Sequence, residues 1–270
     1  NMNNIMKYMY CISIDNKILN KILNLGYIPV GLGDSNFSSE WLTDKNLINI
    51  SDKNQFYGEY TFHYFFWKNL LKEIPENEWV GFCGYRRFWK NKNNIHNSND
   101  IESLVIKKIP EEWNNYETII GDKLDVKGLK WIKVIKYGKI AILRNPKAIF
   151  NEKYRNIRFH FDMFHGNGIL DKAVDQLNQN DRIKFYEYIN KQNSFNQGNM
   201  FITKSKKIMN EYYSVLFEWL KKCEKVFGFD LEGYGKKRLY AFLAERFLSY
   251  WFKENTKYLE WPVFFHDLRK

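Results

Sequence analysis

Two adjacent arginines, Arg86 and Arg87, are the side chains in this sequence best suited to bind an anion. They lie in the segment Val80–Trp89, where an apolar run with two glycines predicts a buried strand that ends in the two arginines. Ligands of open α/β sheets bind at the carboxyl ends of the strands. Guanidinium groups fixed at that edge can hold a phosphate through paired hydrogen bonds, so we expect a phosphate site. The alternative is a structural ion pair with a carboxylate such as Glu59.

Two groups of histidines and carboxylates have spacings that could ligate a metal. Glu59 and His63 lie one turn apart on a predicted helix, and His160, Asp162 and His165 lie close together on a predicted loop. A half-buried polar pair is the simpler interpretation of the first group, and a polar turn is the simpler interpretation of the second. Neither group by itself predicts a metal site.

Several familiar catalytic motifs are absent from the sequence. It contains no Walker loop, no G-x-G-x-x-G after the first predicted strand, no H-E-x-x-H and no G-x-S-x-G. Their absence argues against hydride transfer, P-loop phosphoryl transfer, zinc-dependent proteolysis and α/β-hydrolase chemistry.

The composition suits anionic partners without selecting one. The 270 residues include 42 Lys and Arg against 31 Asp and Glu, which gives a formal net charge of +11. Such a charge favours a phosphorylated substrate, an anionic membrane face or a nucleic acid. The basic residues are dispersed, and no RRM, OB-fold or helix-turn-helix signature is present, so nucleic-acid binding ranks below a small anionic ligand. The 18% of aromatic residues predict a core built from large rings.

The cysteines and the lack of long apolar segments bear on the cellular compartment. Cys11, Cys83 and Cys223 are far apart and lie in apolar surroundings, which predicts buried thiols in a reducing environment. Residues 1–7 lack the apolar core of a secretory signal, and no stretch approaches the roughly 20 apolar residues that span a bilayer. We expect a cytoplasmic protein, with the inner membrane face as a candidate peripheral contact.

Apolar segments alternate with amphipathic ones, which predicts a mixed α/β sheet flanked by helices. The apolar segments expected in or near the sheet are Tyr8–Ile14, Tyr27–Leu32, Leu47–Ile50, Val80–Trp89, Glu117–Gly121, Phe195–Ile202 and Tyr258–Phe265. The main helices are expected at Ile18–Leu25, Tyr57–Lys72, Ile101–Ile109, Ile169–Leu177, Asp181–Lys191, Lys204–Val226 and Lys236–Lys253. A hairpin is expected over Trp131–Leu143. No linker divides the chain, so residues 1–270 are expected to form one domain whose portion 204–270 is mainly helical.

Several segments together resemble a known family. They are Asn49–Asn54, Glu59–Thr61 and Trp67–Asn69, similar to N-I-S-x-K-N, E-L-T and W-K-N; Gly81–Phe88, similar to G-L-C-H-Y-R-R-Y; and Asn199–Ile202 and Ala244–Leu248, similar to N-M-F-I and S-E-R-L-L. The resemblance is to an uncharacterised-domain family of capsular and exopolysaccharide gene clusters. Its members are assigned as glycosyltransferases, some of them galactofuranosyltransferases. Gly84 departs from the pattern, which has histidine there.

The resemblance implies a GT-A-like, Rossmann-like fold that binds a nucleotide sugar. Arg86 and Arg87 would then bind the diphosphate of the donor, the role that a divalent cation on an Asp-x-Asp motif has in most GT-A enzymes. The segment that begins at Phe195 resembles the F-N-x-G sequence beside the sugar in such enzymes. The complete set of implied donor-binding residues is Lys53, Asn54, Glu59, Tyr85, Arg86, Arg87, Asn196, Gly198 and Asn199.

Metal and base assignments follow from the same resemblance. Two arginines can neutralise a diphosphate, so no metal is required as the first expectation; Asp122 and Asp125, three residues apart, are the alternative ligands for Mn²⁺ or Mg²⁺. A transferase that inverts the anomeric centre needs a base for the acceptor hydroxyl. Glu245 is the first candidate and Asp162, with His160, is the second. The simpler interpretation of Glu245 is a salt bridge with its neighbour Arg246.

We therefore predict a glycosyltransferase that uses a UDP-linked hexose or a related nucleotide sugar. Its acceptor would be a saccharide, a lipid-linked sugar or another glycoconjugate. A non-catalytic nucleic-acid-binding protein and a catalytically inactive sugar-binding module are the alternatives. Steep salt-dependent binding to DNA or RNA would favour the first alternative.

Overall fold

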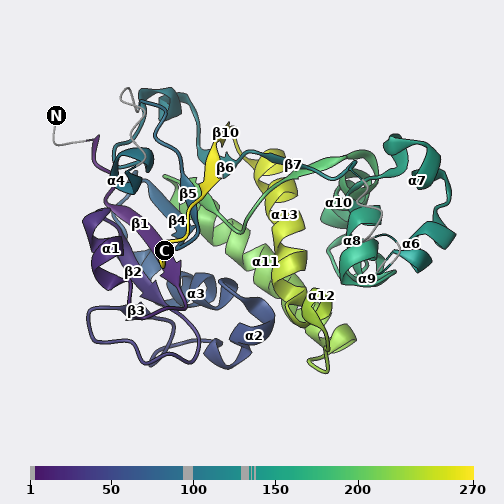
Figure 1. Ribbon diagram of the computed structural model, residues 1–270, viewed down its shortest axis with the longest axis horizontal. Helices are drawn as coiled ribbons and strands as arrows, with labels where there is room; N and C mark the ends of the chain where they lie inside the picture. The colour runs from purple at the N-terminus through teal and green to yellow at the C-terminus, as the bar shows by residue number, and fades with distance from the viewer. Residues whose placement is uncertain (1–3, 94–99, 129–133, 135, 137) are drawn as a thin grey trace.

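A computed structural model describes residues 4–93, 100–128, 134, 136 and 138–270, and a central sheet organises it (Figure 1). Seven of its strands follow the order β10-β6-β9-β4-β1-β2-β3, and β5 and β11 extend it beside β4. Their bounds are β1 (Tyr8–Ser13), β2 (Ile28–Gly31), β3 (Leu42–Thr43), β4 (Val80–Gly84), β5 (Arg87–Trp89), β6 (Thr118–Gly121), β9 (Phe201–Thr203), β10 (Tyr258–Trp261) and β11 (Val263–Phe265).

The sheet is mostly parallel. Strands β4, β1, β2 and β3 run in one direction, and β6 and β10 are parallel to each other. Strand β9 is antiparallel to both β4 and β6, and β11 is antiparallel to β5. The predicted α/β class, a mixed sheet flanked by helices, is confirmed.

Both faces of the sheet are buried, because side chains on a strand alternate between them. Tyr10 and Phe82 belong to the core on one face, whereas Met9, Cys11 and Cys83 belong to the core on the other. This explains why β1 and β4 are apolar at nearly every position. All three cysteines are free and buried.

Helices cover each face. On the first face lie α2 (Asn54–Tyr57), α3 (Tyr60–Phe65), α11 (Lys206–Phe227) and α13 (Leu239–Asn255), with α12 (Tyr234–Lys237) just before α13. On the second lie α1 (Leu19–Asn24) and α4 (Ile101–Leu104). Helix α3 continues into a π-helical turn, Phe66–Leu70. Ser205 begins α11 by accepting a hydrogen bond from the backbone N–H of Ile208.

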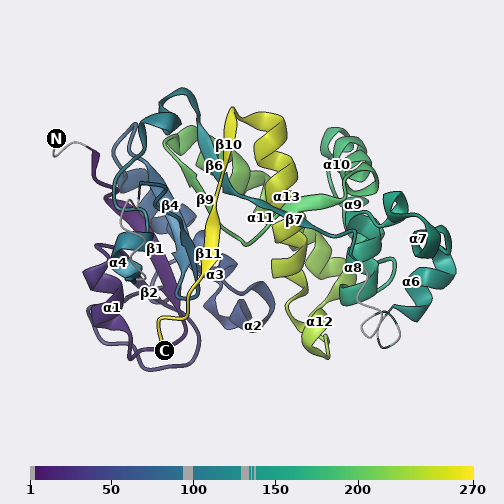
Figure 2. The same cartoon turned by 45° about the horizontal axis from the view of Figure 1, so that its top comes forward.

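A helical lobe extends from the sheet and lies beyond α13 (Figures 1 and 2). It contains α6 (Lys139–Arg144), α7 (Lys147–Phe150), α8 (Ile157–His165), α9 (Ile169–Val174) and α10 (Gln179–Lys191). The antiparallel strands β7 (Lys123–Asp125) and β8 (Ser194–Asn196) connect it to the rest of the chain. Part of the lobe has a small core of its own, made by Val134, Ala141, Ala148, Phe159 and Met163.

Two predicted strands are wrong as single elements. Segment Val80–Trp89 forms strands β4 and β5, and the turn between them contains Tyr85 and Arg86. Segment Phe195–Ile202 divides into β8 and β9, which belong to different sheets. Gly198 lies between them with φ +78°, a backbone conformation that breaks a strand.

Three other predictions also differ. The expected polar turn around Asp162 is helix α8, which Asn156 caps by accepting a hydrogen bond from the backbone N–H of Phe159. In the expected hairpin, residues 139–144 are helical, and 131–133, 135 and 137 lie outside the described residues. Leu47–Ile50 is no strand, and β3 takes the third parallel position instead.

Candidate active site

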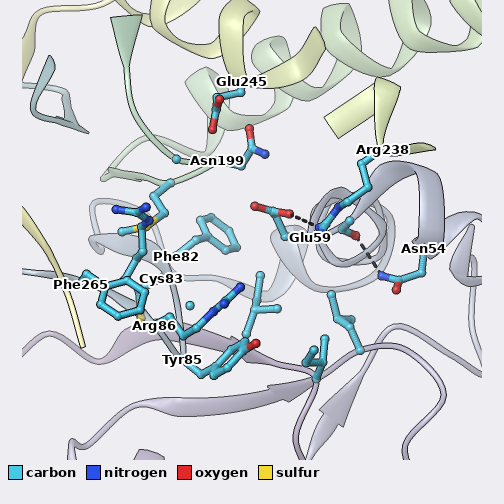
Figure 3. Close-up of a pocket in the computed structure, with 18 of the residues that line it drawn as sticks. Asn54, Glu59, Phe82, Cys83, Tyr85, Arg86, Asn199, Arg238, Glu245 and Phe265 are labelled. Atoms are coloured by element: carbon cyan, nitrogen blue, oxygen red, sulfur yellow. Dashed lines mark hydrogen bonds and ion pairs between the residues drawn. The ribbon is translucent and has the colours of Figure 1, made fainter. Parts of the chain in front are cut away.

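A cavity of about 710 Å³ lies at the carboxyl ends of β1, β2 and β4 (Figure 3). The other walls come from α2 and the start of α3, the segment Gly198–Met200, the α12–α13 junction and Phe265 of β11. Its volume and position are typical of small-molecule sites in α/β proteins. Four basic and two acidic side chains line it: Arg86, Arg87, Lys237, Arg238, Glu59 and Glu245.

Arg86, in the β4–β5 turn, and Arg87, the first residue of β5, both line this cavity. Hydrogen bonds from the backbone N–H of Tyr85 to Ile12 O (2.9 Å) and of His266 to Arg86 O (3.1 Å) hold the turn on both sides. The Arg86 guanidinium lies 5.1 Å from the ring centroid of Tyr85, and that of Arg87 lies 5.9 Å from the Phe265 centroid. The geometry therefore presents both arginines on fixed backbone.

Both guanidinium groups are exposed and lack a carboxylate partner among the described residues. Arg87 donates a long hydrogen bond of 3.4 Å from Nη1 to Gln197 Oε1. Glu59, the partner in the alternative interpretation, pairs with Arg238 instead, at 3.3 Å. The alternative ion pair of Arg86 or Arg87 with Glu59 is absent from the described structure, which leaves their charge available to an anion.

The Glu59–Arg238 ion pair joins two walls of the cavity. Gly58 makes the contact possible, because a Cβ atom there would lie 2.2 Å from Arg238 Nη2. Its φ of +56° also favours glycine. Asn54 supports the same corner by donating hydrogen bonds from Nδ2 to Gly58 O (3.0 Å) and Thr61 Oγ1 (3.1 Å).

Glu245 projects from α13 toward the cavity near Asn199 (Figure 3). Its side chain is 22% exposed, and its Oε1 accepts a 3.0 Å hydrogen bond from Arg246 Nη1. Burial raises the pKa of the Glu245 carboxyl, and the charge of Glu59 adds to the rise. Arg246, Arg87 and the Gly198 backbone N–H oppose it. A carboxylate with a raised pKa can accept a proton near neutral pH.

Arg246 is buried behind Glu245 and anchors it to the lobe. Its Nη2 lies 3.3 Å from His160 Nδ1 and 3.2 Å from His165 Nε2. Burial, and then the charge of Arg246, lower the pKa of His165, so its imidazole is neutral and can accept a hydrogen bond. Glu245 therefore forms the salt bridge of the simpler interpretation and also lines the cavity, and its role as a base stays a prediction. His160 lies behind the site, in contact with Arg246.

The segment after β8 supplies a polar group without a partner. Asn199 Oδ1 is buried and accepts no hydrogen bond from the described residues, and its Nδ2 lies 3.5 Å from Ala241 O. A buried acceptor left unpaired is costly, so a ligand hydroxyl is a natural partner. Asn196 Oδ1 is likewise buried without a partner among the described residues, but Asn196 lies away from the cavity lining, where its Nδ2 donates to Gly121 O (2.6 Å).

Other predicted residues lie elsewhere. Lys53 pairs with Glu224 at 2.9 Å, outside the cavity lining. Asp162 lines a separate hollow of about 100 Å³ in the lobe, where its Oδ1 accepts from the Gly168 N–H (3.1 Å). The structure therefore does not bring Asp162 to the arginines.

The alternative metal ligands are also apart from the cavity lining. Asp122 accepts a 3.0 Å hydrogen bond from Gln197, and Asp125 pairs with Lys127 at 3.4 Å. Among the described residues, no group of three or more His, Cys, Asp or Glu side chains is arranged to hold a metal ion.

A family model matches residues 14–256 of the chain, and its description is "Domain of unknown function (DUF4422)". This chain belongs to that DUF4422 family. No curated protein matches it. A solved structure entitled "WbbM bifunctional glycosytransferase apo structure" is similar in fold, with a TM-score of 0.64 and 19% sequence identity. The similarity covers 97% of this chain but 45% of WbbM, so the DUF4422 chain spans less than half of that protein.

The side chains of this DUF4422 cavity that sequence reasoning missed include Gln55, Lys237, Arg238 and Phe265. Lys236, Lys237 and Arg238 form a basic run where α13 begins. This run was the available signal for Lys237 and Arg238. Phe265 had none, because only the pairing of β11 with β5 brings the end of the chain to the arginines.

Gly84 lines the cavity at the end of β4 and has room for a side chain. A Cβ atom there would meet only the Ile12 carbonyl oxygen within 4 Å, at an ordinary 3.8 Å. We expect Gly84→His to fold normally, with a melting temperature within about 3 °C of the parent. Because the ring would occupy cavity space, we expect the affinity of the cavity for its ligand to change severalfold. Calorimetry with candidate ligands checks this, and unchanged affinities throughout would contradict it.

Proposed function

We propose that this DUF4422 chain is a glycosyltransferase that takes a hexose from a nucleoside diphosphate sugar, with a uridine diphosphate sugar as the first donor to test. The observation that carries the proposal is the pair of arginines without a carboxylate partner, held at the carboxyl ends of parallel strands and facing Glu245 across one cavity. The fold shared with WbbM, whose title names it a bifunctional glycosyltransferase, supports the same class of reaction.

Arg86 and Arg87 bind the donor diphosphate in this proposal. Transfer breaks the bond between the anomeric carbon and the diphosphate oxygen, and the electron pair leaves with the nucleoside diphosphate. The leaving group gains negative charge as the bond breaks. Guanidinium groups stabilise that charge through paired hydrogen bonds, and they do so on a turn that is already ordered.

Glu245 accepts the proton of the acceptor hydroxyl as its oxygen bonds to the anomeric carbon. This role requires inversion at that carbon, because the base and the leaving group lie on opposite sides of it. Asn199 Oδ1 would accept a hydrogen bond from a sugar hydroxyl beside them. The anomeric configuration of the product checks the role of Glu245: retention would remove the need for a base and would contradict it.

The charge on the diphosphate can be neutralised by protein groups alone. Of the two carboxylates that line the cavity, Glu59 is already paired with Arg238. The proposal therefore assigns neutralisation of the diphosphate charge to Arg86 and Arg87. We expect turnover to persist in excess EDTA, measured as release of nucleoside diphosphate. Complete loss that Mn²⁺ or Mg²⁺ restores would contradict this assignment and leave the transferase proposal standing.

The experiment that tests the proposed function is a screen of nucleotide sugars. Thermal shift reports binding, and slow hydrolysis of the donor without an acceptor reports an activated anomeric centre. We expect at least one uridine diphosphate hexose to raise the melting temperature and to be hydrolysed. Binding without hydrolysis or transfer would indicate a sugar-binding module instead. Binding to DNA or RNA alone, with steep salt dependence, would indicate the nucleic-acid alternative.

A further inference from the structure

Helices α6 and α7 expose three large apolar side chains. Ile140 is 62% exposed, Leu143 is 79% exposed and Phe150 is 88% exposed. The residues of α6 and α7 that are buried in the small core of the lobe are Ala141 and Ala148, and Ile142 packs against it partly buried. An amphipathic helix of a soluble domain normally shows the reverse, with large apolar groups inside. Exposed apolar side chains of this kind mark a surface that a protein or a membrane covers.

Positive charge surrounds these apolar residues. Residues 138–155 contain five Lys and Arg and one acidic residue, Glu152. Arg155 orders the segment by donating to the carbonyl oxygens of Ala148 (2.7 Å) and Ile149 (3.0 Å). The ion pairs between described residues include none with Lys139, Lys147 or Lys153. We call the basic apolar surface the group Lys139, Ile140, Leu143, Arg144, Lys147, Phe150 and Lys153, all exposed.

We propose that the basic apolar surface docks the protein on an anionic lipid membrane. Apolar side chains that enter the interface within a ring of Lys and Arg are the chemistry of peripheral membrane binding. Figures 1 and 2 show α6 and α7 at the end of the lobe farthest from the sheet, where a flat partner can reach them. In the part of the chain that the structure describes, no helix is long and apolar enough to cross a bilayer.

A second copy of the chain fits this surface less well. A symmetric contact would place one basic ring against another, and like charges across an interface repel. A nucleic acid would match the charge but leave Leu143 and Phe150 without an apolar environment. The membrane accounts for both properties, and its docking does not depend on the proposed transferase activity.

Co-sedimentation with vesicles tests the proposal. We expect the chain to bind phosphatidylcholine vesicles that contain about 30 mol% phosphatidylglycerol, and to bind pure phosphatidylcholine weakly, because the anionic lipid attracts the basic ring. Raising the salt concentration should release it. Leu143→Glu and Phe150→Glu should each weaken binding about tenfold or more, since they remove buried apolar area and add like charge. Lys139→Gln, Lys147→Gln and Lys153→Gln should each weaken it about fivefold.

Ile183→Glu is the matched control. Ile183 is 61% exposed on α10 of the same lobe, outside the basic apolar surface, and its replacement should leave vesicle binding unchanged. No binding to the anionic vesicles, or equal loss in the control, would overturn the proposal. A dimer in solution that Leu143→Glu dissociates would show that a second copy covers the surface instead. Donor hydrolysis in solution should persist in every variant, so failure of docking and failure of transfer appear in separate assays.

Discussion

Replacing Arg86 or Arg87 with alanine is expected to lower kcat/KM for sugar transfer by about 10²–10³-fold, the cost of losing one group that stabilises developing negative charge. Arg86 lies in the β4–β5 turn and Arg87 begins β5, and neither pairs with a carboxylate among the described residues, so their charge is available to a ligand. Both reductions in kcat/KM should appear with any acceptor, because the arginines bind the diphosphate of the donor. Steady-state kinetics with the donor found in the screen measures them.

The fold should survive both substitutions. The side chains are exposed, and their visible contacts are single aromatic rings and one long hydrogen bond. An exposed cation–π contact contributes about 0.5–1 kcal/mol, which corresponds to a shift in melting temperature of a few degrees at this size. A large fall in melting temperature would mean that the arginines hold the turn rather than the donor.

Two comparisons separate charge from geometry. Arg86→Lys and Arg87→Lys keep the charge but lose the planar fork, so we expect only partial activity, about tenfold below the parent. Arg182→Ala removes an exposed arginine of α10 outside the cavity lining and should have no effect. If both alanine variants keep full activity, Arg86 and Arg87 do not bind the diphosphate.

The position of Arg86 and Arg87 at the end of a buried strand could be predicted from the sequence, because it depends on neighbouring residues. Continuous burial and a run of small and apolar residues define β4, and the arginines come where that run stops. The hairpin was not predictable, because the Tyr85–Arg86 turn lacks a typical turn pair. Contacts with the end of the chain hold it: Leu268 N–H donates to Tyr85 O at 3.1 Å. Contacts between residues so far apart in the sequence cannot be predicted from the residues next to either one.

The same limit explains the misplaced residues. Lys53 lies next to Asn54 in the sequence, yet its ammonium reaches Glu224 on α11, and only the packing of α11 decides that. For Asp162, a local signal was present and missed: Asn156 is a good N-cap residue three positions before Phe159, which predicts a helix start. On helix α8, Asp162 lines the separate hollow within the lobe, whereas His160 contacts Arg246.

Glu245→Gln is expected to lower kcat by about 10²–10⁴-fold, the contribution of a general base, with little change in the affinity for the nucleoside diphosphate product. Glutamine keeps the shape and can still meet Arg246, but it cannot accept the acceptor proton. Product binding by calorimetry therefore serves as the check on folding. Asp162→Asn is the matched control, since Asp162 lines a separate hollow, and it should keep full activity.

The pH profile of kcat distinguishes a base from a structural carboxylate. A base works only when it is ionised, and burial raises the pKa of Glu245 above the ordinary value of 4.5. Activity should therefore fall as the pH drops through a pKa higher than 4.5, and Glu245→Gln should lose that limb. Arg246 stabilises the ionised form, so Arg246→Lys, which keeps the charge but weakens the 3.0 Å contact, should move the limb to higher pH. An unchanged limb in Glu245→Gln would assign it to another group and leave the ion pair as the sole role of Glu245.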